Sequence, residues 1–281
     1  MKINKDIVCI VVTHNPPPTI NKLAEQISNI RILMIDSSDS DKYNLMKEHF
    51  KNKENVIIYH EDRHIGLGNA LNIGIKMSQE IGFKYLLIME DDSYFRDNVD
   101  LANIINKFSY SHNNDSVLYL SETDSNSADD FLPVNYYLGT NTGILISFGL
   151  ADKISFRSDF FMDQIDIDFQ FNVRKYGHKT YVTKKGIIAR LPIGREKGRG
   201  INTISIFRFY LLTRNTLRLF LEKKISPVGL VYILGYFLKG VVSGQNIKLL
   251  LTALLRGLLD GIKNNLGITE TLKFFRPDLQ S

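Results

Sequence analysis

Cysteine is almost absent from this 281-residue chain, whose single thiol is Cys9, so a disulfide framework is excluded. That thiol lies inside an apolar run, and such sparse cysteine usage favours a reducing compartment. The chain also lacks a long apolar stretch: the uncharged segment 225–238 has 14 residues, against the roughly 20 that a bilayer-spanning helix needs. No apolar stretch followed by a small-residue cleavage site stands near the N-terminus, and we expect no secretory signal.

Internal repeats, low-complexity segments and recognised nucleic-acid-binding motifs are missing as well. The net charge of +5 conceals a split, because residues 171–281 contain 20 Lys/Arg and 5 Asp/Glu, whereas residues 1–170 contain 15 and 25. The basic residues of the second half alternate with aliphatic runs and form no polar stripe. We therefore expect no nucleic acid partner, and a basic half that suits anionic lipid or a diphosphate.

What the chain does contain is an alternation of apolar strands and amphipathic helices. Strands are expected at 7–12, 32–35, 56–59 and 84–89, and helical patterns lie between them. The first run is apolar and β-branched throughout, which is typical of a parallel strand buried on both faces. The pattern predicts an α/β fold with an open, mostly parallel central sheet flanked by helices, and ligands at the carboxyl ends of its strands.

The character of the sequence changes near residue 203, where apolar residues become dense and cations interrupt them. The leucines from 249 to 259 predict an amphipathic helix, because the cations Lys248, Arg256 and Lys263 flank or interrupt them. Such a helix can pack on a catalytic domain or lie in a membrane interface, and the basic charge favours contact with an anionic membrane. We expect a nucleotide-binding and catalytic domain at 1–202 and a helical region at 203–281.

Three consecutive acidic residues, Glu90, Asp91 and Asp92, directly follow the apolar strand 84–89. A strand that ends in carboxylates delivers hard oxygen ligands to the edge of a sheet. Such oxygens suit Mg²⁺ or Mn²⁺, which usually reach a protein together with a phosphorylated ligand. The alternative is a solvated acidic turn after a buried strand.

Further polar and glycine motifs recur in a fixed order across about residues 6–220. They are Val12–Asn15, Ile35–Ser38, Gly66–Gly74, Glu90–Ser93, Asp166–Asp168 with Arg174 and Gly177, and Arg208–Tyr210 with Arg214 and Asn215. In this order and spacing they resemble the family 2 inverting glycosyltransferases with the GT-A fold, most closely the rhamnosyltransferase and galactofuranosyltransferase branch. The resemblance implies transfer of a sugar from a UDP- or dTDP-linked donor to a hydroxyl of a glycan or lipid-linked acceptor.

For the donor, the resemblance implies a site built from several of these motifs. Its residues would be Thr13, His14, Asn15, Asp36, Gly68, Asn69, Glu90 and Asp91. Asp92 would bind the metal, with Asp91 beside it, and Glu90 or Asp91 would contact ribose or metal-bound water. Two alternatives stay open: Asp36 can form a helix cap or Asx-turn, and the glycines can form a turn that caps the following helix.

For the acceptor, the resemblance implies that Asp166 opens a helix and acts as the general base. Asp163 and Asp168 would lie in the acceptor site, and the loop with Asn141, Thr142 and Gly143 would border it. Asp163 and Asp166 are three residues apart and would share a helix face, while Asp168 turns away. The alternatives are carboxylates favoured by a helix N-terminus and an ordinary turn before a strand.

One departure from the family pattern concerns the metal. Many relatives have a histidine about 25 residues after the base, whereas this chain reads Ala189–Gly194 there and contains none. The metal would then be held by Asp91 and Asp92, donor phosphates and water. Alternatively, part of the charge on the diphosphate comes from Arg190, Arg195, Lys197 or Arg199. For Arg214, pairing with acidic groups is favoured over contact with a pyrophosphate.

These features together predict a metal-dependent inverting glycosyltransferase, cytoplasmic and peripheral on the inner face of the cell membrane, which can also form oligomers. One alternative is a sugar-1-phosphate nucleotidyltransferase, but no Gly-rich loop with a following Arg or Lys stands after the first strand. Another is a catalytically silent family member that binds a glycan or scaffolds a synthesis complex. The sequence does not name the sugar.

Overall fold

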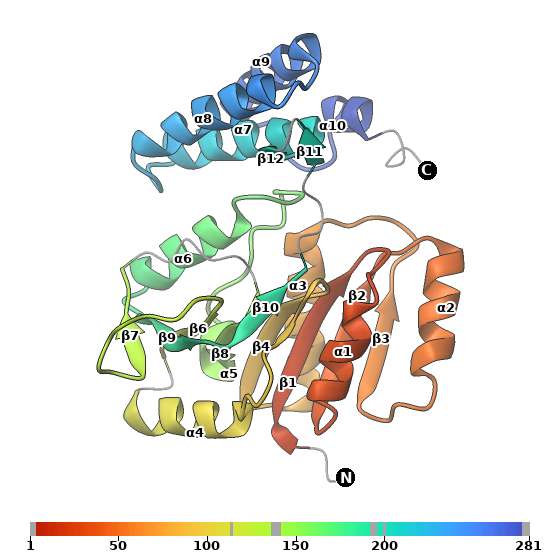
Figure 1. The fold of residues 1–281 in the computed structure, drawn as a ribbon, viewed down its shortest axis with the longest axis vertical. Coiled ribbons are helices and arrows are strands. Elements are labelled where there is room, and N and C mark those ends of the chain that lie inside the picture. Colours follow the sequence, from red (N-terminus) through yellow and green to blue (C-terminus); the bar gives the residue numbers. More distant parts are fainter. Residues whose placement is uncertain (1–3, 113–114, 136–141, 192–195, 199–200, 277–281) are drawn as a thin grey trace. The chain divides into compact units, whose positions relative to one another are not determined.

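The structure, a computed structural model, describes residues 4–112, 115–135, 142–191, 196–198 and 201–276 (Figure 1). The chain divides into two compact units. The first, called the sheet unit here, comprises Met1–Ile65, Asn69–Phe156 and Phe169–Leu191. The second, the helical unit, comprises Gly66–Gly68, Arg157–Asp168 and Pro192–Ser281. The helical unit thus contains three segments from the first 202 residues, at 66–68, 157–168 and 192–202, in addition to the region 203–281 that the sequence sets apart.

An eight-stranded sheet forms the centre of the sheet unit, in the order β3-β2-β1-β4-β8-β6-β9-β7. Its strands are β1 (Asn4–Thr13), β2 (Ile30–Asp36), β3 (Val56–His60), β4 (Tyr85–Glu90), β6 (Val117–Ser121), β7 (Phe131–Pro133), β8 (Ile144–Ser147) and β9 (Thr180–Gly186). The strands β3, β2, β1 and β4 are parallel, and so are β6 and β9. The strand β8 runs antiparallel to both of its neighbours. The expected α/β fold with a mostly parallel central sheet is confirmed.

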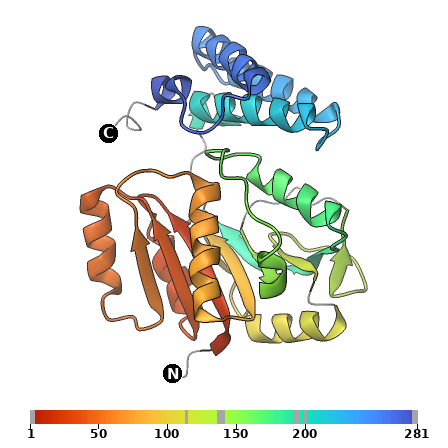
Figure 2. The ribbon, with the colours of Figure 1, turned by 180° about the vertical axis from the view of Figure 1, so that it is seen from behind.

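Helices cover both faces of this sheet because its central strands are apolar on both sides. On one face, α1 (Thr19–Gln26), α2 (Ser40–Phe50) and α4 (Leu101–Ser111) share a core with Cys9 and Val11 of β1. On the other face lies α3 (Leu67–Ile81), which crosses the sheet in Figure 2. A Cβ at Gly74 would meet the side chain of Ile10 at 2.6 Å, so glycine permits this close packing.

The carboxyl ends of the parallel strands bring polar side chains to one edge of the sheet. The register pairs Thr13 with Asp36 and Asp36 with His60, and it pairs Val12 with Glu90. Directly after β4, the short strand β5 (Ser93–Phe95) pairs antiparallel with β10 (Ile188–Arg190). Beyond β8 lie α5 (Phe148–Ala151) and α6 (Ile165–Lys175), and α6 begins in the helical unit.

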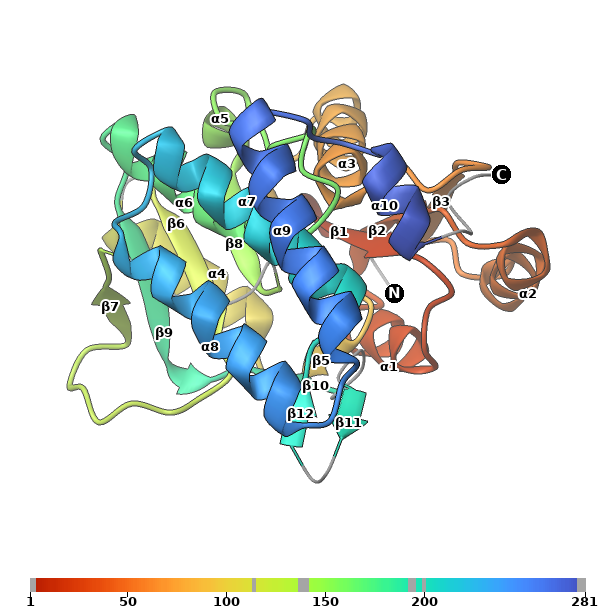
Figure 3. The same cartoon turned by 90° about the horizontal axis from the view of Figure 1, so that it is seen from above.

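The helical unit is built around α7 (Ile206–Leu221), on which α8 (Val228–Val242) and α9 (Ile247–Lys263) lie (Figure 3). A short hairpin of β11 (Glu196–Gly198) and β12 (Ile201–Thr203) precedes α7, and α10 (Glu270–Phe275) follows α9. A Cβ at Gly257 would lie 2.9 Å from Thr213, which shows how closely α9 approaches α7. None of the described helices is long and apolar enough to cross a membrane.

Candidate active site

Asp36 stands at the centre of a buried polar cluster at the carboxyl ends of β1, β2 and β3. Its carboxylate is fully buried and accepts hydrogen bonds from Thr13 Oγ1 at 2.7 Å and Ser38 Oγ at 2.5 Å. The backbone N–H of Ser38 donates at 3.2 Å, which closes an Asx-turn, and His60 Nδ1 lies 2.7 Å away. These protein groups occupy the acceptor capacity of the carboxylate. Asp36 therefore organises this edge, and a role in holding the donor stays a prediction.

His14 and Asn15 tie the loop after β1 to the loop after β2. His14 Nδ1 lies 2.7 Å from the carbonyl oxygen of Ser37, and the backbone N–H of Asn15 donates to Ser38 Oγ at 2.7 Å. Asn15 has a φ of 51°, in the left-handed region that asparagine tolerates. The two loops are thereby fixed beside each other at the sheet edge.

Three residues that the sequence reading passed over also stand at this edge. The ring of His60 stacks on Tyr43, with centroids 3.8 Å apart, and the ring of His64 lies 4.3 Å from that of His14. His60 is the last residue of β3, as Asp36 is the last residue of β2. The rule that ligands bind at the carboxyl ends of parallel strands could therefore have selected His60 from the sequence. These rings give the edge flat surfaces in addition to its hydrogen-bonding groups.

The acidic residues after β4 separate into two groups. Glu90 and Asp92, two positions apart, both contact the guanidinium of Arg190: Nη2 donates to Glu90 and lies 3.2 Å from Asp92 Oδ2. Asp91 does not share this partner. Burial, and then the charge of Asp92, raise the pKa of Asp91 to about 7, although the backbone N–H of His14 and the charge of Arg190 lower it. Glu90 and Asp92 thus form the carboxylate pair, with Asp91 beside it.

This pair fits a divalent cation by the chemistry of its donors. Both carboxylates offer hard oxygens, and a guanidinium cation already lies against both of them. In the described part of the chain, no cluster of three or more His, Cys, Asp or Glu side chains could hold a metal ion. Mg²⁺ is commonly held by one or two carboxylates together with substrate phosphates and water, so the pair is sufficient once a diphosphate is present.

The glycines of the segment 66–68 approach protein backbone. Gly66 has a φ of +81°, and a Cβ there would lie 2.8 Å from the carbonyl oxygen of Phe161. A Cβ at Gly68 would clash with the carbonyl oxygen of Arg157. At the start of α3, Asn69 Nδ2 donates to the carbonyl oxygen of Ile65 at 3.0 Å. These contacts explain the glycines within the helical unit, and contact of Gly68 and Asn69 with a donor stays a prediction.

The turn that leads into α6 directly precedes the helix that contains the predicted base, and it is strained. Asp163 and Gln164 have φ values of 59° and 67°, which are uncommon for residues other than glycine. Arg208 of α7 holds the carboxylate of Asp163 through Nη2 at 2.5 Å, and Asn215 Nδ2 donates to the carbonyl oxygens of Met162 and Asp163 at 2.8 and 2.9 Å. Strained backbone that its surroundings hold in place is characteristic of functional sites.

Asp166 lies in the first turn of α6, directly after this strained turn. Burial, and then the charge of Asp163, raise its pKa to about 6, while the N–H of Ile167 acts in the opposite direction. A carboxylate whose pKa lies just below neutrality can accept a proton at pH 7 and release it again. The environment of Asp166 is therefore suited to general-base chemistry.

Asp168, two positions further along, has a different environment. Its carboxylate is buried and accepts a hydrogen bond from Lys224 Nζ at 2.6 Å, while Arg157 Nη1 lies 3.5 Å away. A buried carboxylate between two cations stabilises the surrounding packing, and breaking such a pair is costly. Asp168 therefore has cationic partners within the helical unit, and its predicted contact with an acceptor stays untested.

The predicted acceptor loop is only partly described, and Asn141 lies outside the described residues. Thr142 is buried, and its hydroxyl accepts a hydrogen bond from the backbone N–H of Glu90 at 3.3 Å. Gly143 has a φ of +70° and precedes β8. Thr142 thus supports the end of β4 at the point where the acidic residues begin.

Arg214 is fully buried in α7, and its described hydrogen-bond partners are an amide and a backbone carbonyl, where the sequence favoured acidic groups. Its Nε donates to Asn215 Oδ1 at 2.9 Å and its Nη1 to the carbonyl oxygen of Gly267 at 3.0 Å. Burial lowers its pKa below the usual value. The side chain connects α7 to the segment after α9.

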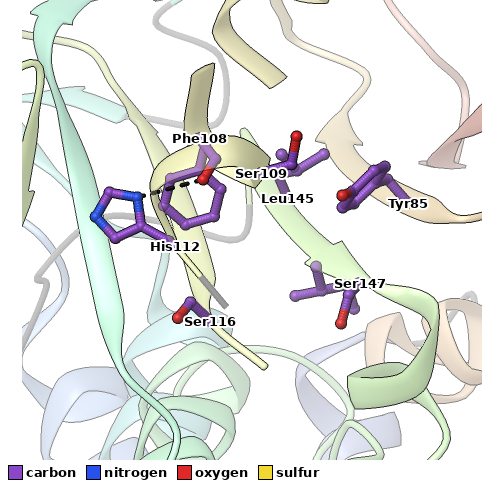
Figure 4. A pocket seen from close by; sticks show the side chains of 8 residues that line it. Tyr85, Phe108, Ser109, His112, Ser116, Leu145 and Ser147 are labelled. Atoms are coloured by element: carbon purple, nitrogen blue, oxygen red, sulfur yellow. Dashed lines mark hydrogen bonds between the residues drawn. The ribbon is translucent and has the colours of Figure 1, made fainter. Parts of the chain in front are cut away.

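A small hollow in the sheet unit lies away from this edge, at the amino end of β4 (Figure 4). Its volume is about 10 Å³, and Tyr85, Phe108, His112 and Ser147 are among the residues that line it. That is room for about one water molecule and not for a nucleotide.

A model of glycosyl transferase family 2 matches residues 9–162, more than half of the chain. The chain therefore belongs to glycosyl transferase family 2. The matched segment begins within β1, contains β2 to β4 and the acidic residues after β4, and ends at Met162, one residue before Asp163. A search of curated proteins found no match.

Among solved structures, the chain is similar to S. aureus TarS 1–349 in complex with UDP-GlcNAc, at 15% identity and a TM-score of 0.52, over 98% of this chain and 76% of that one. It is similar to the mannosyltransferase PcManGT from Pyrobaculum calidifontis in complex with GDP-Man and Mn²⁺, at 11% identity and a TM-score of 0.57, over 92% and 87%. GalNAc-T7 with UDP, GalNAc and Mn²⁺ matches at 12% identity and a TM-score of 0.52, over 66% and 44%. At these identities the likeness shows a shared fold.

Proposed function

We propose that this protein is an inverting glycosyltransferase that moves a sugar from a nucleoside diphosphate donor to a hydroxyl of a glycan or lipid-linked acceptor. The observation that carries the proposal is the pair Glu90 and Asp92, which share one cation at the carboxyl end of β4 in a family 2 chain. We prefer a donor that contains a uracil or thymine nucleotide. Among family members, we prefer the rhamnosyltransferase and galactofuranosyltransferase branch as relatives. The similar structures contain both UDP-GlcNAc and GDP-Man, so they favour a nucleotide-sugar without selecting the base.

In this proposal Asp166 is the general base. Its carboxylate takes the proton of the acceptor hydroxyl while that oxygen forms a bond to the anomeric carbon of the donor. The bond from the anomeric carbon to the phosphate oxygen breaks with its electron pair, and the nucleoside diphosphate leaves on the opposite side, which inverts the configuration. Arg208 and Asn215 hold the turn that presents Asp166.

The donor would bind at the sheet edge, against Thr13, His14, Asn15 and the cluster around Asp36. Glu90, Asp91 and Asp92 would hold Mg²⁺ or Mn²⁺, which when bound supplies positive charge to the departing diphosphate. Thr142 and Gly143 would support the same edge from β8. Asp163 positions the base in this account through its pairing with Arg208.

We also propose that the helical unit places the protein on the inner face of an anionic membrane. Many apolar side chains on α8 and α9 are exposed: Val228, Val231, Tyr232, Leu234, Leu238, Val242, Ile247, Leu249, Leu251, Leu255, Leu259 and Ile262. The exposed charges of these two helices are Lys239, Lys248, Arg256 and Lys263. Their one carboxylate, Asp260, is buried and accepts a hydrogen bond from Tyr210. An apolar helix face flanked by cations alone suits an interface with anionic lipid, close to a lipid-linked acceptor.

A thermal-unfolding panel tests the reaction class. The full-length protein is heated with UDP-, dTDP- and GDP-sugars, with and without Mn²⁺, beside Asp92→Asn and the exposed control Asp129→Asn. A donor that binds the folded state raises the midpoint by mass action. We expect Mn²⁺ to enhance that rise in the wild type and in the control but not in Asp92→Asn.

Two results would contradict the proposal. The first is a panel in which no nucleotide-sugar raises the unfolding midpoint under either condition. The second is release of pyrophosphate from a nucleoside triphosphate and a sugar 1-phosphate, which would make the protein a nucleotidyltransferase. A donor that binds without transfer or hydrolysis in the presence of Mn²⁺ would instead indicate a catalytically silent member.

A further inference from the structure

Arg190 is fixed beside the acidic residues by the small sheet of β5 and β10. The ladder pairs Arg190 with Ser93, and the backbone N–H of Leu191 donates to the carbonyl oxygen of Asp92 at 2.9 Å. The two strands are about a hundred residues apart in sequence, so this register is a tertiary feature. It places one guanidinium next to the carboxylates that follow β4.

The guanidinium contacts three carboxylates of the sheet unit. Nη2 donates to Glu90 and lies 3.3 and 3.2 Å from the two carboxylate oxygens of Asp92, and Nη1 is 3.8 Å from Glu122 Oε1. The side chains are only partly buried, with 23% exposure for Arg190 and 14% for Asp92. A guanidinium stays charged throughout the accessible pH range, so this cation cannot be titrated away.

The position of this guanidinium hinders a metal ion from binding the same oxygens. A divalent cation such as Mg²⁺ binds carboxylate oxygens at about 2.0–2.1 Å and would need the lone pairs that now accept from Nη2. Two cations at one carboxylate pair also repel each other. Arg190 and a metal ion therefore compete for Glu90 and Asp92.

We propose that Arg190 is a positioning residue that holds Glu90 and Asp92 together in the free protein and yields them to a divalent cation, after which its guanidinium binds the diphosphate of the donor. The planar fork of arginine pairs with phosphate oxygens in the same two-pronged way as with carboxylates. The partial exposure of the side chain at the sheet edge leaves it room to turn. The second half of this inference rests on the proposed function, whereas the competition with metal does not.

The test is the Mn²⁺ affinity of the full-length protein without any nucleotide, measured by electron paramagnetic resonance of free Mn²⁺. We expect Arg190→Gln to bind Mn²⁺ about tenfold more tightly than the wild type, or better, because it removes a positive charge from the pair. Arg190→Lys keeps the charge but cannot bridge both carboxylates, so it should fall between the two. Arg31→Gln makes the same change at the amino end of β2 and should match the wild type.

A second measurement tests whether the guanidinium of Arg190 binds the diphosphate. Calorimetric titration with UDP at a Mn²⁺ concentration that saturates every variant should show about tenfold weaker binding to Arg190→Gln than to the wild type and to Arg31→Gln. A purely structural role would weaken Mn²⁺ and UDP binding alike, whereas we expect opposite changes.

Unchanged or weaker Mn²⁺ binding by Arg190→Gln would overturn the inference. If that variant does not fold, the same result with Arg190→Lys would overturn it. Equal UDP affinity of Arg190→Gln and wild type would overturn the second half. If tighter Mn²⁺ binding is found but no variant binds any nucleoside diphosphate, the competition stands and the proposed function fails.

Discussion

The sheet unit and the helical unit differ in how densely their exposed surfaces gather apolar side chains. At the ligand edge of the sheet unit, carboxylates such as Asp36 and Asp92 find partners within the protein while the apolar side chains lie inside. The helical unit buries Arg214 and Asp260 and exposes aliphatic side chains, with Val231 at 64% and Leu255 at 59% exposure. The surface of a soluble monomer rarely gathers so many apolar groups, and this supports the proposal that α8 and α9 contact an apolar partner. The sheet unit is suited to an ionic ligand, and α8 and α9 are suited to an apolar surface.

We assign proton transfer to the helical unit and donor binding to the sheet unit. The largest expected effect of this assignment is on the rate of sugar transfer. Asp166→Asn should lower the rate of transfer by about 10²–10⁴-fold, because a positioned base of this kind contributes that much. Donor affinity should stay unchanged, since the predicted donor contacts other than Gly68 belong to the sheet unit. Initial rates of nucleoside diphosphate release with acceptor, beside calorimetric donor binding, measure both quantities. Transfer at the wild-type rate would refute the role of Asp166, and Asp129→Asn is the control.

Membrane contact should belong to the helical unit alone. Leu255→Asp should weaken binding to vesicles rich in phosphatidylglycerol by about 10–100-fold, because burying a leucine side chain contributes about 1.5–3 kcal/mol. Leu45→Asp makes the same change at an exposed leucine of the sheet unit, with 66% exposure, and should leave binding unchanged. Flotation of the protein with vesicles measures the effect.

Equal loss of flotation in both leucine variants would erase the distinction between the units. Flotation that depends on neither variant, together with a concentration-dependent mass in solution, would indicate that a second copy of the chain covers α8 and α9.

The pH dependence of the transfer rate tests whether Asp166, in the helical unit, is the base. Burial holds the proton on Asp166 up to a pKa of about 6, so the base is lost as the pH falls through that value. At saturating Mn²⁺, which would keep Asp91 ionised, we expect kcat/KM to fall about tenfold per pH unit below about pH 6 and to be level above it. An acid limb near the ordinary aspartate value of about 3.9 would contradict the assignment.

The smallest effect tests the packing that keeps α8 and α9 in place. Gly257→Ala should destabilise the protein by about 1–3 kcal/mol, because its Cβ would lie 2.9 Å from Thr213. Gly235→Ala in α8 meets nothing within 4 Å and should stabilise its helix slightly, by about 0.5–1 kcal/mol. Thermal unfolding of the two variants gives the comparison, and equal midpoints would show that α9 does not pack as described.

The sequence was sufficient for the strands of the sheet unit because their pattern is local. The apolar runs at 7–12 and 56–59 became β1 and β3 with boundaries only a few residues longer at most. The acidic cluster was found because carboxylates directly follow β4. The strand after Gly143 was foreseen, but its antiparallel direction and its place between β4 and β6 were not, since strand order depends on contacts far apart in sequence.

Side-chain partners were harder to foresee for the same reason. Asp168 pairs with Lys224, 56 positions away, and Arg190 with Glu90, 100 positions away. Spacing shows that a carboxylate lies at a helix start or a strand end, but it does not show whether a cation from another element already contacts it. The pairing of Asp36 with Ser38 was the exception, because an Asx-turn is local and was among the alternatives.

A crystal structure of Asp166→Asn with an intact nucleotide-sugar and Mn²⁺ would test the proposed roles of Asp92 and Asp166 most directly. We predict that the diphosphate will lie against Glu90 and Asp92 and that the side chain at position 166 will face the anomeric carbon of the sugar. A donor bound elsewhere, or a residue 166 on the far surface from that sugar, would contradict this account.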